Sequence, residues 1–218
     1  MRSPILAVSV LLCGFIPVYG QKVVKEPFRF QNKDRTYYLF VPDGLKKEAP
    51  APMIVLLHGS GRNGLSLMDK WKDLAKEEGV ILVGPDASDP QSWRIPEDAP
   101  DFLYELIESL KAKYPVNARR VYLFGHSAGA VASLYLALLE SEYFAATAIH
   151  AGAFNSIDSP LIERTKRKIP ISIFVGTNDN FFPLSVVRET HNALNTRGFN
   201  VQLNEIKGHT HNYYERSV

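Results

Sequence analysis

The sequence contains a single cysteine in 218 residues and shows almost no excess of charge of either sign. One cysteine excludes an intramolecular disulfide framework and a zinc site built from several cysteines. With 25 Lys and Arg against 23 Asp and Glu, the formal charge is +2, which gives no electrostatic reason to expect nucleic acid or an anionic membrane as a partner. Hydrophobic residues make up 45% of the chain and charged residues 22%, so the composition excludes a disordered protein and favours one globular domain.

An apolar stretch stands at the N-terminus, where residues 5–18 follow the basic Arg2. Val18 and Gly20 provide small residues at the −3 and −1 positions of a cleavage site before Gln21. This is the layout of a secretory signal peptide, and the apolar run is short for a membrane span. We therefore expect residues 1–20 to be a signal peptide and residues 21–218 to form a single domain, secreted or periplasmic, with no stable membrane insertion. A buried first strand or a membrane anchor is the alternative.

Apolar strands and amphipathic helices alternate along most of the remaining chain. Strands are predicted at residues 53–58, 80–84, 121–125, 147–151, 169–176 and 199–206, and helices at 65–78, 101–113, 128–139 and 183–197. Before them, residues 28–31 and 36–42 read as a hairpin around residues 32–35. The alternation predicts an α/β fold with a mostly parallel central sheet and helices on both faces. The short connection from residue 152 to residue 169 leaves no room for a lid domain.

One motif carries chemistry. Gly125-His126-Ser127-Ala128-Gly129 is a G-x-S-x-G sequence that directly follows a predicted strand and opens a predicted helix. This is the setting of a nucleophile elbow, in which a strained turn exposes the serine and only glycines fit beside the neighbouring strand and helix. A glycine-rich turn with a serine N-cap is the alternative. If Ser127 is a nucleophile, it needs a histidine base oriented by a carboxylate.

Candidates for the acid and the base follow later strands. Asp179 stands just after the strand at 169–176, which places it at the same sheet edge as Ser127. The base is expected after the last strand, where the sequence reads Gly208-His209-Thr210-His211. We favour His209, which follows a glycine directly after the strand, and His211 remains open. The His-x-His pair lacks an evident further zinc ligand nearby, so we expect no metal. Catalysis by a serine, a histidine and an aspartate needs no cofactor, so we expect none.

Two backbone N–H groups are needed to stabilise a developing oxyanion. We expect one from Ala128, the residue after the nucleophile, and the other from Ser60 in the glycine-rich loop after the strand at 53–58. In that loop, His58 is expected to be structural. Three further histidines are expected to serve packing or to lie at the surface: His126, His150 and His191.

On these motifs the chain resembles the α/β-hydrolases, in particular the secreted esterases that include feruloyl esterases, acetyl-xylan esterases and polyhydroxybutyrate depolymerase-like proteins. Residues 117–129 resemble the segment leading into the nucleophile, residues 176–183 the acid turn, and residues 209–214 the histidine followed by aromatic residues, which supports His209. Formylglutathione-hydrolase relatives place the histidine before a small residue and two tyrosines, which favours His211. Ala130 stands where many relatives have a second glycine. Only seven residues follow His211, too few for the C-terminal helix of the relatives, so we expect that helix to be missing and an apolar face to be exposed near the last strand.

The resemblance implies a secreted serine hydrolase that cleaves carboxylic esters through an acyl-enzyme. The expected substrate is a small-molecule or polymer-borne ester, and the sequence indicates no oligomeric state. A serine peptidase of the same fold and a non-catalytic carbohydrate- or polymer-binding protein on a hydrolase scaffold are the alternatives. Four aromatic residues on loops at the same sheet edge are candidates for lining the pocket: Trp93, Phe154, Phe181 and Phe182.

Overall fold

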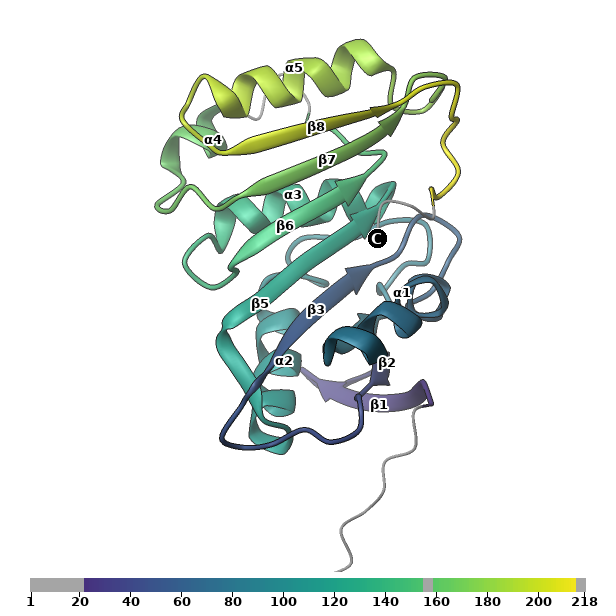
Figure 1. The fold of residues 1–218 in the computed structure, drawn as a ribbon, viewed down its shortest axis with the longest axis vertical. Coiled ribbons are helices and arrows are strands. Elements are labelled where there is room, and N and C mark those ends of the chain that lie inside the picture. Colours follow the sequence, from purple (N-terminus) through teal and green to yellow (C-terminus); the bar gives the residue numbers. More distant parts are fainter. Residues whose placement is uncertain (1–21, 155–158, 215–218) are drawn as a thin grey trace, which may run out of the picture.

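Strands and helices alternate in the computed structural model, which describes residues 22–154 and 159–214 (Figure 1). The strands are β1 (Val24–Phe30), β2 (Lys33–Phe40), β3 (Ala51–Leu57), β4 (Ile81–Pro85), β5 (Val116–His126), β6 (Ala146–His150), β7 (Ile171–Gly176) and β8 (Val201–Ile206). The helices are α1 (Leu65–Glu78), α2 (Asp101–Lys113), α3 (Ala128–Leu139), α4 (Ser159–Arg164) and α5 (Leu184–Asn195). No helix within the described ranges is long and apolar enough to cross a membrane. The signal peptide expected at residues 1–20 lies outside the described residues.

All the strands belong to one sheet, in the order β1-β2-β4-β3-β5-β6-β7-β8. The pairs β1–β2 and β2–β4 are antiparallel, and the other neighbours are parallel. The mostly parallel α/β sheet expected from the sequence is therefore confirmed. Because β3, β5, β6, β7 and β8 run in the same direction, the loops after them meet at one edge of the sheet, on the right-hand side of Figure 1.

Some local details differ from the prediction. The hairpin turn is shorter than expected, since Phe30 pairs directly with Lys33. Gln31 and Asn32 form a two-residue turn with φ angles of 45° and 62°. A turn with positive φ at both central residues matches the twist of the two strands, so pairing continues up to it. The short helix α4, in the connection between β6 and β7, was not predicted.

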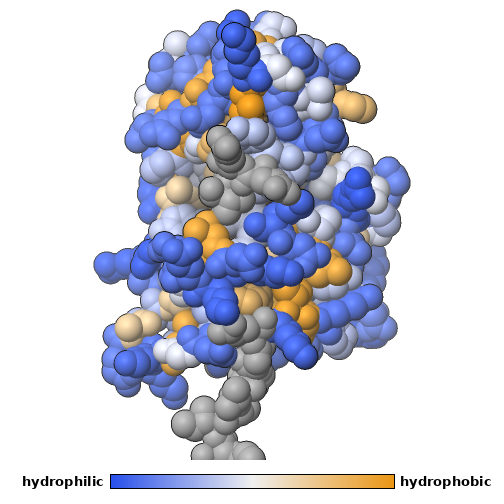
Figure 2. Space-filling model, turned by 45° about the vertical axis from the view of Figure 1, so that its right-hand side comes forward, coloured by the Kyte–Doolittle hydropathy of each residue, from blue (hydrophilic) through white to orange (hydrophobic). Residues whose placement is uncertain are grey.

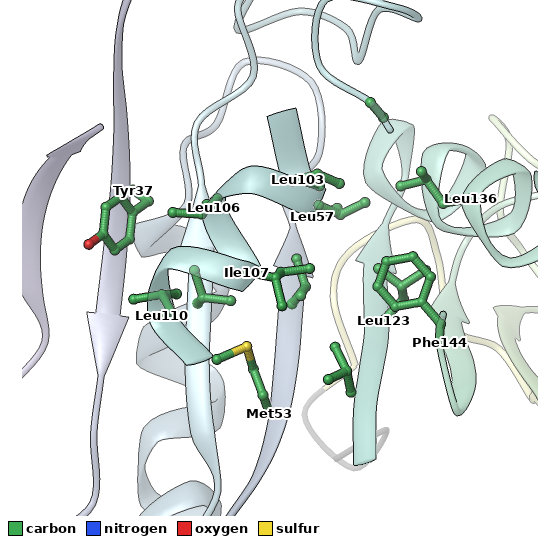
Figure 3. Close-up of a cluster of buried hydrophobic side chains, with 14 of the residues drawn as sticks. Tyr37, Met53, Leu57, Leu103, Leu106, Ile107, Leu110, Leu123, Leu136 and Phe144 are labelled. Carbon is green, nitrogen blue, oxygen red and sulfur yellow. The ribbon is translucent and has the colours of Figure 1, made fainter. Parts of the chain in front are cut away.

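The helices lie on both faces of the sheet. Helix α1 packs on one face, where Met68 and Trp71 contact Phe124 and other apolar side chains of the central strands. Helices α2, α3 and α5 pack on the opposite face in two neighbouring clusters. Figure 3 shows the first of these, in which side chains of α2 such as Ile107 lie over Met53 of β3. Burial of the central strands on both faces explains their nearly continuous apolar sequences.

The face that α1 covers is left partly open beside the helix. A hollow of about 310 Å³ lies there over β5, β6 and β7. Its lining is largely apolar and includes Ile54, Trp71, Tyr122, Phe124, Ala146 and Ala148. The sequence predicts an exposed apolar face near the last strand, and the hollow reaches that strand, β8, at Gln202.

Candidate active site

Ser127 occupies a sharp turn between β5 and α3. Its backbone angles are φ 56° and ψ −118°, a combination that non-glycine residues rarely adopt, and its N–H donates to the carbonyl of His150 at 3.0 Å. A Cβ on Gly125 would overlap the backbone of Gly129, and a Cβ on Gly129 would overlap the carbonyl of Leu57 in β3. The two glycines therefore allow the strand, the turn and the helix to approach one another, which is the geometry expected of a nucleophile elbow.

Asp179 lies in the turn that follows β7. The N–H of Asp179 donates to the carbonyl of Gly176 at 3.1 Å, which closes the turn. Its Oδ1 accepts hydrogen bonds from the N–H groups of Phe181 and Phe182 at 2.8 and 2.9 Å. The side chain is fully buried. Backbone donors thus fix the carboxylate in one orientation at the sheet edge.

His211 joins Asp179 to Ser127. Its Nδ1 lies 2.9 Å from Oδ2 and 3.2 Å from Oδ1 of Asp179, and its Nε2 lies 2.9 Å from Oγ of Ser127. A carboxylate only accepts, so Nδ1 carries a hydrogen, and Nε2 lies where it can accept from the serine hydroxyl. The structure therefore brings together a serine, a histidine and an aspartate in the order that serine hydrolysis uses.

His209, which the sequence analysis favours, is not the histidine in this arrangement. Its Nε2 lies 2.7 Å from the carbonyl of Asn212, and its ring packs against Tyr214 at a centroid distance of 4.9 Å. The N–H of His209 donates to the carbonyl of Ile206, so this residue still belongs to the turn that closes β8. Two more residues are needed to reach Ser127 across the sheet edge, and the preference for His209 is corrected to His211.

His58 holds the loop after β3, as the sequence predicts. Its Nδ1–H donates to the carbonyl of Gly59 at 2.9 Å, and its Nε2 accepts from the N–H of Ala87 at 3.1 Å. Nε1–H of Trp93 donates to the carbonyl of His58 at 2.9 Å. Burial lowers the pKa of His58, which keeps the ring neutral so that one nitrogen donates and the other accepts. These contacts fix the loop that continues into Ser60.

Two hollows flank Ser127. The first, of about 590 Å³, is lined by Ser60, Ser127 and His211 and by the charged side chains of Arg62 and Lys70, among others. The second, of about 420 Å³, lies between α3 and the loop before α2, and its mostly apolar lining includes Trp93, Ile95, Ala128, Val131 and Tyr135. Figure 2 turns this side of the molecule forward and shows apolar patches among mainly hydrophilic side chains.

Three of the four aromatic candidates lie at the site. Trp93 lines the apolar hollow. The ring centroids of Phe181 and Phe182 lie 4.6 and 5.9 Å from the ring centroid of His211. Phe181 is 76% exposed. Phe154 instead is buried and packs edge-on against Tyr135 of α3. It therefore contributes to the core rather than to a surface at the site.

Two histidines for which the sequence predicts packing or surface exposure, His126 and His150, lie behind His211. The ring of His126 is 5.2 Å from that of His150 and 5.4 Å from that of His211. His150 is fully buried, and neither ring nitrogen has a hydrogen-bond partner among the described residues. Burial, with smaller effects of the neighbouring histidines, lowers its pKa to about 3. Within residues 22–154 and 159–214, no group of three or more His, Cys, Asp or Glu is arranged to hold a metal ion.

Comparison with known proteins identifies relatives among esterases. The chain is 27% identical over 164 residues to the bifunctional acetylxylan esterase/xylanase XynS20E of Neocallimastix patriciarum, an alignment that covers 73% of this chain and 23% of that protein. Among solved structures, a thermostable esterase superposes with a TM-score of 0.69 at 23% identity, covering 85% of this chain and 54% of that one. The ferulic acid esterase AmCE1/Fae1A of Anaeromyces mucronatus superposes with a TM-score of 0.71 at 21% identity, covering 90% and 86%.

These structural likenesses show a shared α/β-hydrolase fold. The chain spans less than a quarter of the curated relative and about half of the thermostable esterase. A family model, that of the dienelactone hydrolases, matches residues 36–218 and so includes most of β2, all of β3 to β8 and every residue of the candidate site. The chain belongs to the dienelactone hydrolase family.

Proposed function

We propose that this protein is a secreted serine hydrolase that cleaves carboxylic esters. The observation that carries the proposal is the continuous series of contacts from Asp179 through His211 to Ser127, at 2.9 Å on each side of the imidazole. A serine hydroxyl is a weak nucleophile at neutral pH and needs a base held in this way. The esterase names of the relatives support the same reaction, and the apolar N-terminal stretch supports secretion.

In the proposed reaction, Oγ of Ser127 attacks the acyl carbon while Nε2 of His211 takes the hydroxyl proton. The carboxylate of Asp179 stabilises the imidazolium that forms, and the N–H groups of Ser60 and Ala128 stabilise the oxyanion. Ala128 is the first residue of α3, so its N–H has no acceptor within the helix. His211 then protonates the departing alcohol and leaves an acyl-enzyme. Water attacks this ester with the help of the same base, which releases the acid and restores Ser127.

The two hollows suit the two halves of an ester. The apolar hollow beside Ala128 is proposed to take the acyl group, and the polar hollow with Arg62 and Lys70 the alcohol. Relatives named as acetylxylan and ferulic acid esterases support an alcohol that belongs to a sugar polymer. A small-molecule ester fits the same arrangement, and no cofactor is required.

Hydrolysis of 4-nitrophenyl acetate and butyrate tests the proposal. Ser127→Ala is expected to lower kcat by at least about a thousandfold. His211→Ala is expected to do the same, whereas His209→Ala, a matched control in the same loop, keeps kcat within about twofold. A fluorophosphonate probe is expected to label the wild type and not Ser127→Ala. A folded wild type that neither hydrolyses the esters nor takes up the probe would refute the proposal and favour a binding protein. Cleavage of peptides in preference to esters would favour a peptidase.

A further inference from the structure

His126, the last residue of β5, contacts the backbone of the residue whose side chain is the proposed base. Its Nε2 lies 3.1 Å from the carbonyl oxygen of His211. Since a carbonyl oxygen only accepts, Nε2 of His126 is the donor. The next residue along the chain, Ser127, contacts the ring of the same His211 at 2.9 Å. His126 thus binds the backbone of His211, and the next residue, Ser127, contacts its side chain.

The segment that carries His211 depends on such contacts because it has no regular structure. Its beginning is fixed to the acid turn, where the N–H of Gly208 donates to Oγ1 of Thr177 at 2.8 Å and the N–H of Asn178 donates to the carbonyl of His209 at 2.9 Å. These hydrogen bonds end two residues before His211. The hydrogen bond from His126 fixes the backbone at His211 itself and joins it to a central strand of the sheet.

The environment of His126 keeps its ring neutral and in place. Burial is the largest cause that lowers its pKa, while the hydrogen bond to His211 acts in the opposite direction. A neutral ring adds no positive charge beside the imidazolium that forms on His211 during the proposed reaction. On the Nδ1 side, a Cβ added to Gly59 would lie 3.2 Å from the ring, and on another side the ring of Tyr213 packs edge-on at 5.8 Å. The ring therefore has close neighbours on these two sides and borders the polar hollow on another.

We propose that His126 is a positioning residue that holds His211 at the distance from Ser127 that proton transfer requires. The inference rests on the proposed ester hydrolysis. The inference assigns a function to the first variable position of the G-x-S-x-G motif, which His126 occupies. The ring of His126 borders the polar hollow, and it acts on the proposed reaction through the backbone of His211.

Two amide variants of the full chain separate positioning from packing. In His126→Gln the amide nitrogen reaches the place of Nε2 and can donate to the carbonyl of His211, whereas in His126→Asn the amide is one methylene too short. Both replace the ring by the same polar group. We expect His126→Gln to keep kcat for 4-nitrophenyl acetate within about threefold of the wild type, and His126→Asn to lose about tenfold or more with KM within about twofold.

The wild type and Ser127→Ala accompany both variants. If the wild type is active and Ser127→Ala is not, the proposed function stands and the amide variants decide the inference alone. Equal kcat values for the two amide variants would overturn it. If His126→Asn unfolds, nitrogen NMR of the imidazole in the wild type decides, because the inference requires the hydrogen of His126 on Nε2. A hydrogen on Nδ1 only would overturn it without any measurement of activity.

Discussion

Arg35 and Asp98 form an ion pair in the interior, with Nη2 of the arginine 2.6 Å from Oδ1 of the aspartate and side chains that are 7% and 0% exposed. The same carboxylate accepts hydrogen bonds from the N–H and hydroxyl of Ser88 and from the N–H of Arg94. Arg35 lies in β2, and Asp98 lies near the end of the loop between β4 and α2, which also carries Trp93. The ion pair therefore connects the antiparallel part of the sheet to the loop that contacts the candidate site.

Loss of one partner of this ion pair is expected to be costly, because the other charge stays buried without compensation. Asp98→Ala is expected to lower the free energy of unfolding by about 3–5 kcal/mol in urea titrations followed by circular dichroism. The exposed pair of Arg29 and Asp34 has the same N–O distance of 2.6 Å with side chains 62% and 84% exposed. Asp34→Ala, the matched control, is expected to cost less than about 1 kcal/mol. If both variants lost a similar amount of unfolding free energy, burial would not be what makes the Arg35–Asp98 pair important for stability.

A side chain at Gly129 is expected to be incompatible with the elbow. The Cβ of alanine would overlap the carbonyls of Leu57 and His58, so α3 would have to move away from β3. Gly129→Ala is expected to destabilise the fold by at least about 3 kcal/mol. Gly44→Ala is the control: its φ is 74° with nothing within 4 Å of the added Cβ, and its cost is about 1–2 kcal/mol. Thermal unfolding of both variants measures the difference, and a Gly129→Ala protein as stable as the control would be inconsistent with this close contact.

Phe181 is expected to matter for substrate and not for stability. Its ring is 76% exposed and lies 4.6 Å from that of His211, so a planar or sugar group bound there can stack on it. Phe181→Ala is expected to change the free energy of unfolding by less than about 0.5 kcal/mol. It is expected to lower kcat/KM for an aromatic ester by about two- to tenfold. Tyr104→Ala, an exposed aromatic on α2, is the control and should leave kcat/KM unchanged. An unaltered kcat/KM in Phe181→Ala would exclude stacking.

The buried histidines predict a loss of stability in mild acid. The pKa of His150 is lowered from 6.5 to about 3, so the unfolded chain binds a proton between these values that the folded protein does not. Stability is therefore complete above pH 6.5 and falls as the pH decreases, by about 2 kcal/mol between pH 7 and pH 5 from this residue. His58 and His126, whose pKa values are also lowered, act in the same direction.

His150→Leu tests the contribution of this one residue. The variant is expected to fold, because both ring nitrogens of His150 lack a hydrogen-bond partner among the described residues and an apolar side chain leaves no donor or acceptor unpaired. Urea titrations at pH 7 and pH 5 should show a smaller loss of unfolding free energy in the variant than in the wild type. The same loss in both proteins would place the pH dependence in other groups.

Local sequence patterns were sufficient to predict the α/β alternation and to place Ser127 and Asp179 at the same edge of the sheet. Each of these depends on a short segment: the elbow on a strand, a glycine-flanked serine and a helix, and the acid on a turn after an apolar strand. The choice between His209 and His211 depends on the distance from the end of β8 to Ser127 across the sheet, which neighbouring residues do not encode. For the same reason the contact between His126 and His211 was missed, because it joins residues 85 positions apart.

The order of the strands attaches the residues of the site to parts of the sheet that differ in local stability. Ser127 follows β5 in the middle of the sheet, whereas His211 follows β8, which among the described strands has β7 as its only neighbour. The margin of a fold opens at a lower free energy than its centre. Release of β8 would withdraw His211, the proposed base, while Ser127 stays in an intact core. On warming, enzymatic turnover should therefore disappear at a lower temperature than the one at which the sheet unfolds. Loss of activity would then measure the release of β8 and not the unfolding of the whole domain.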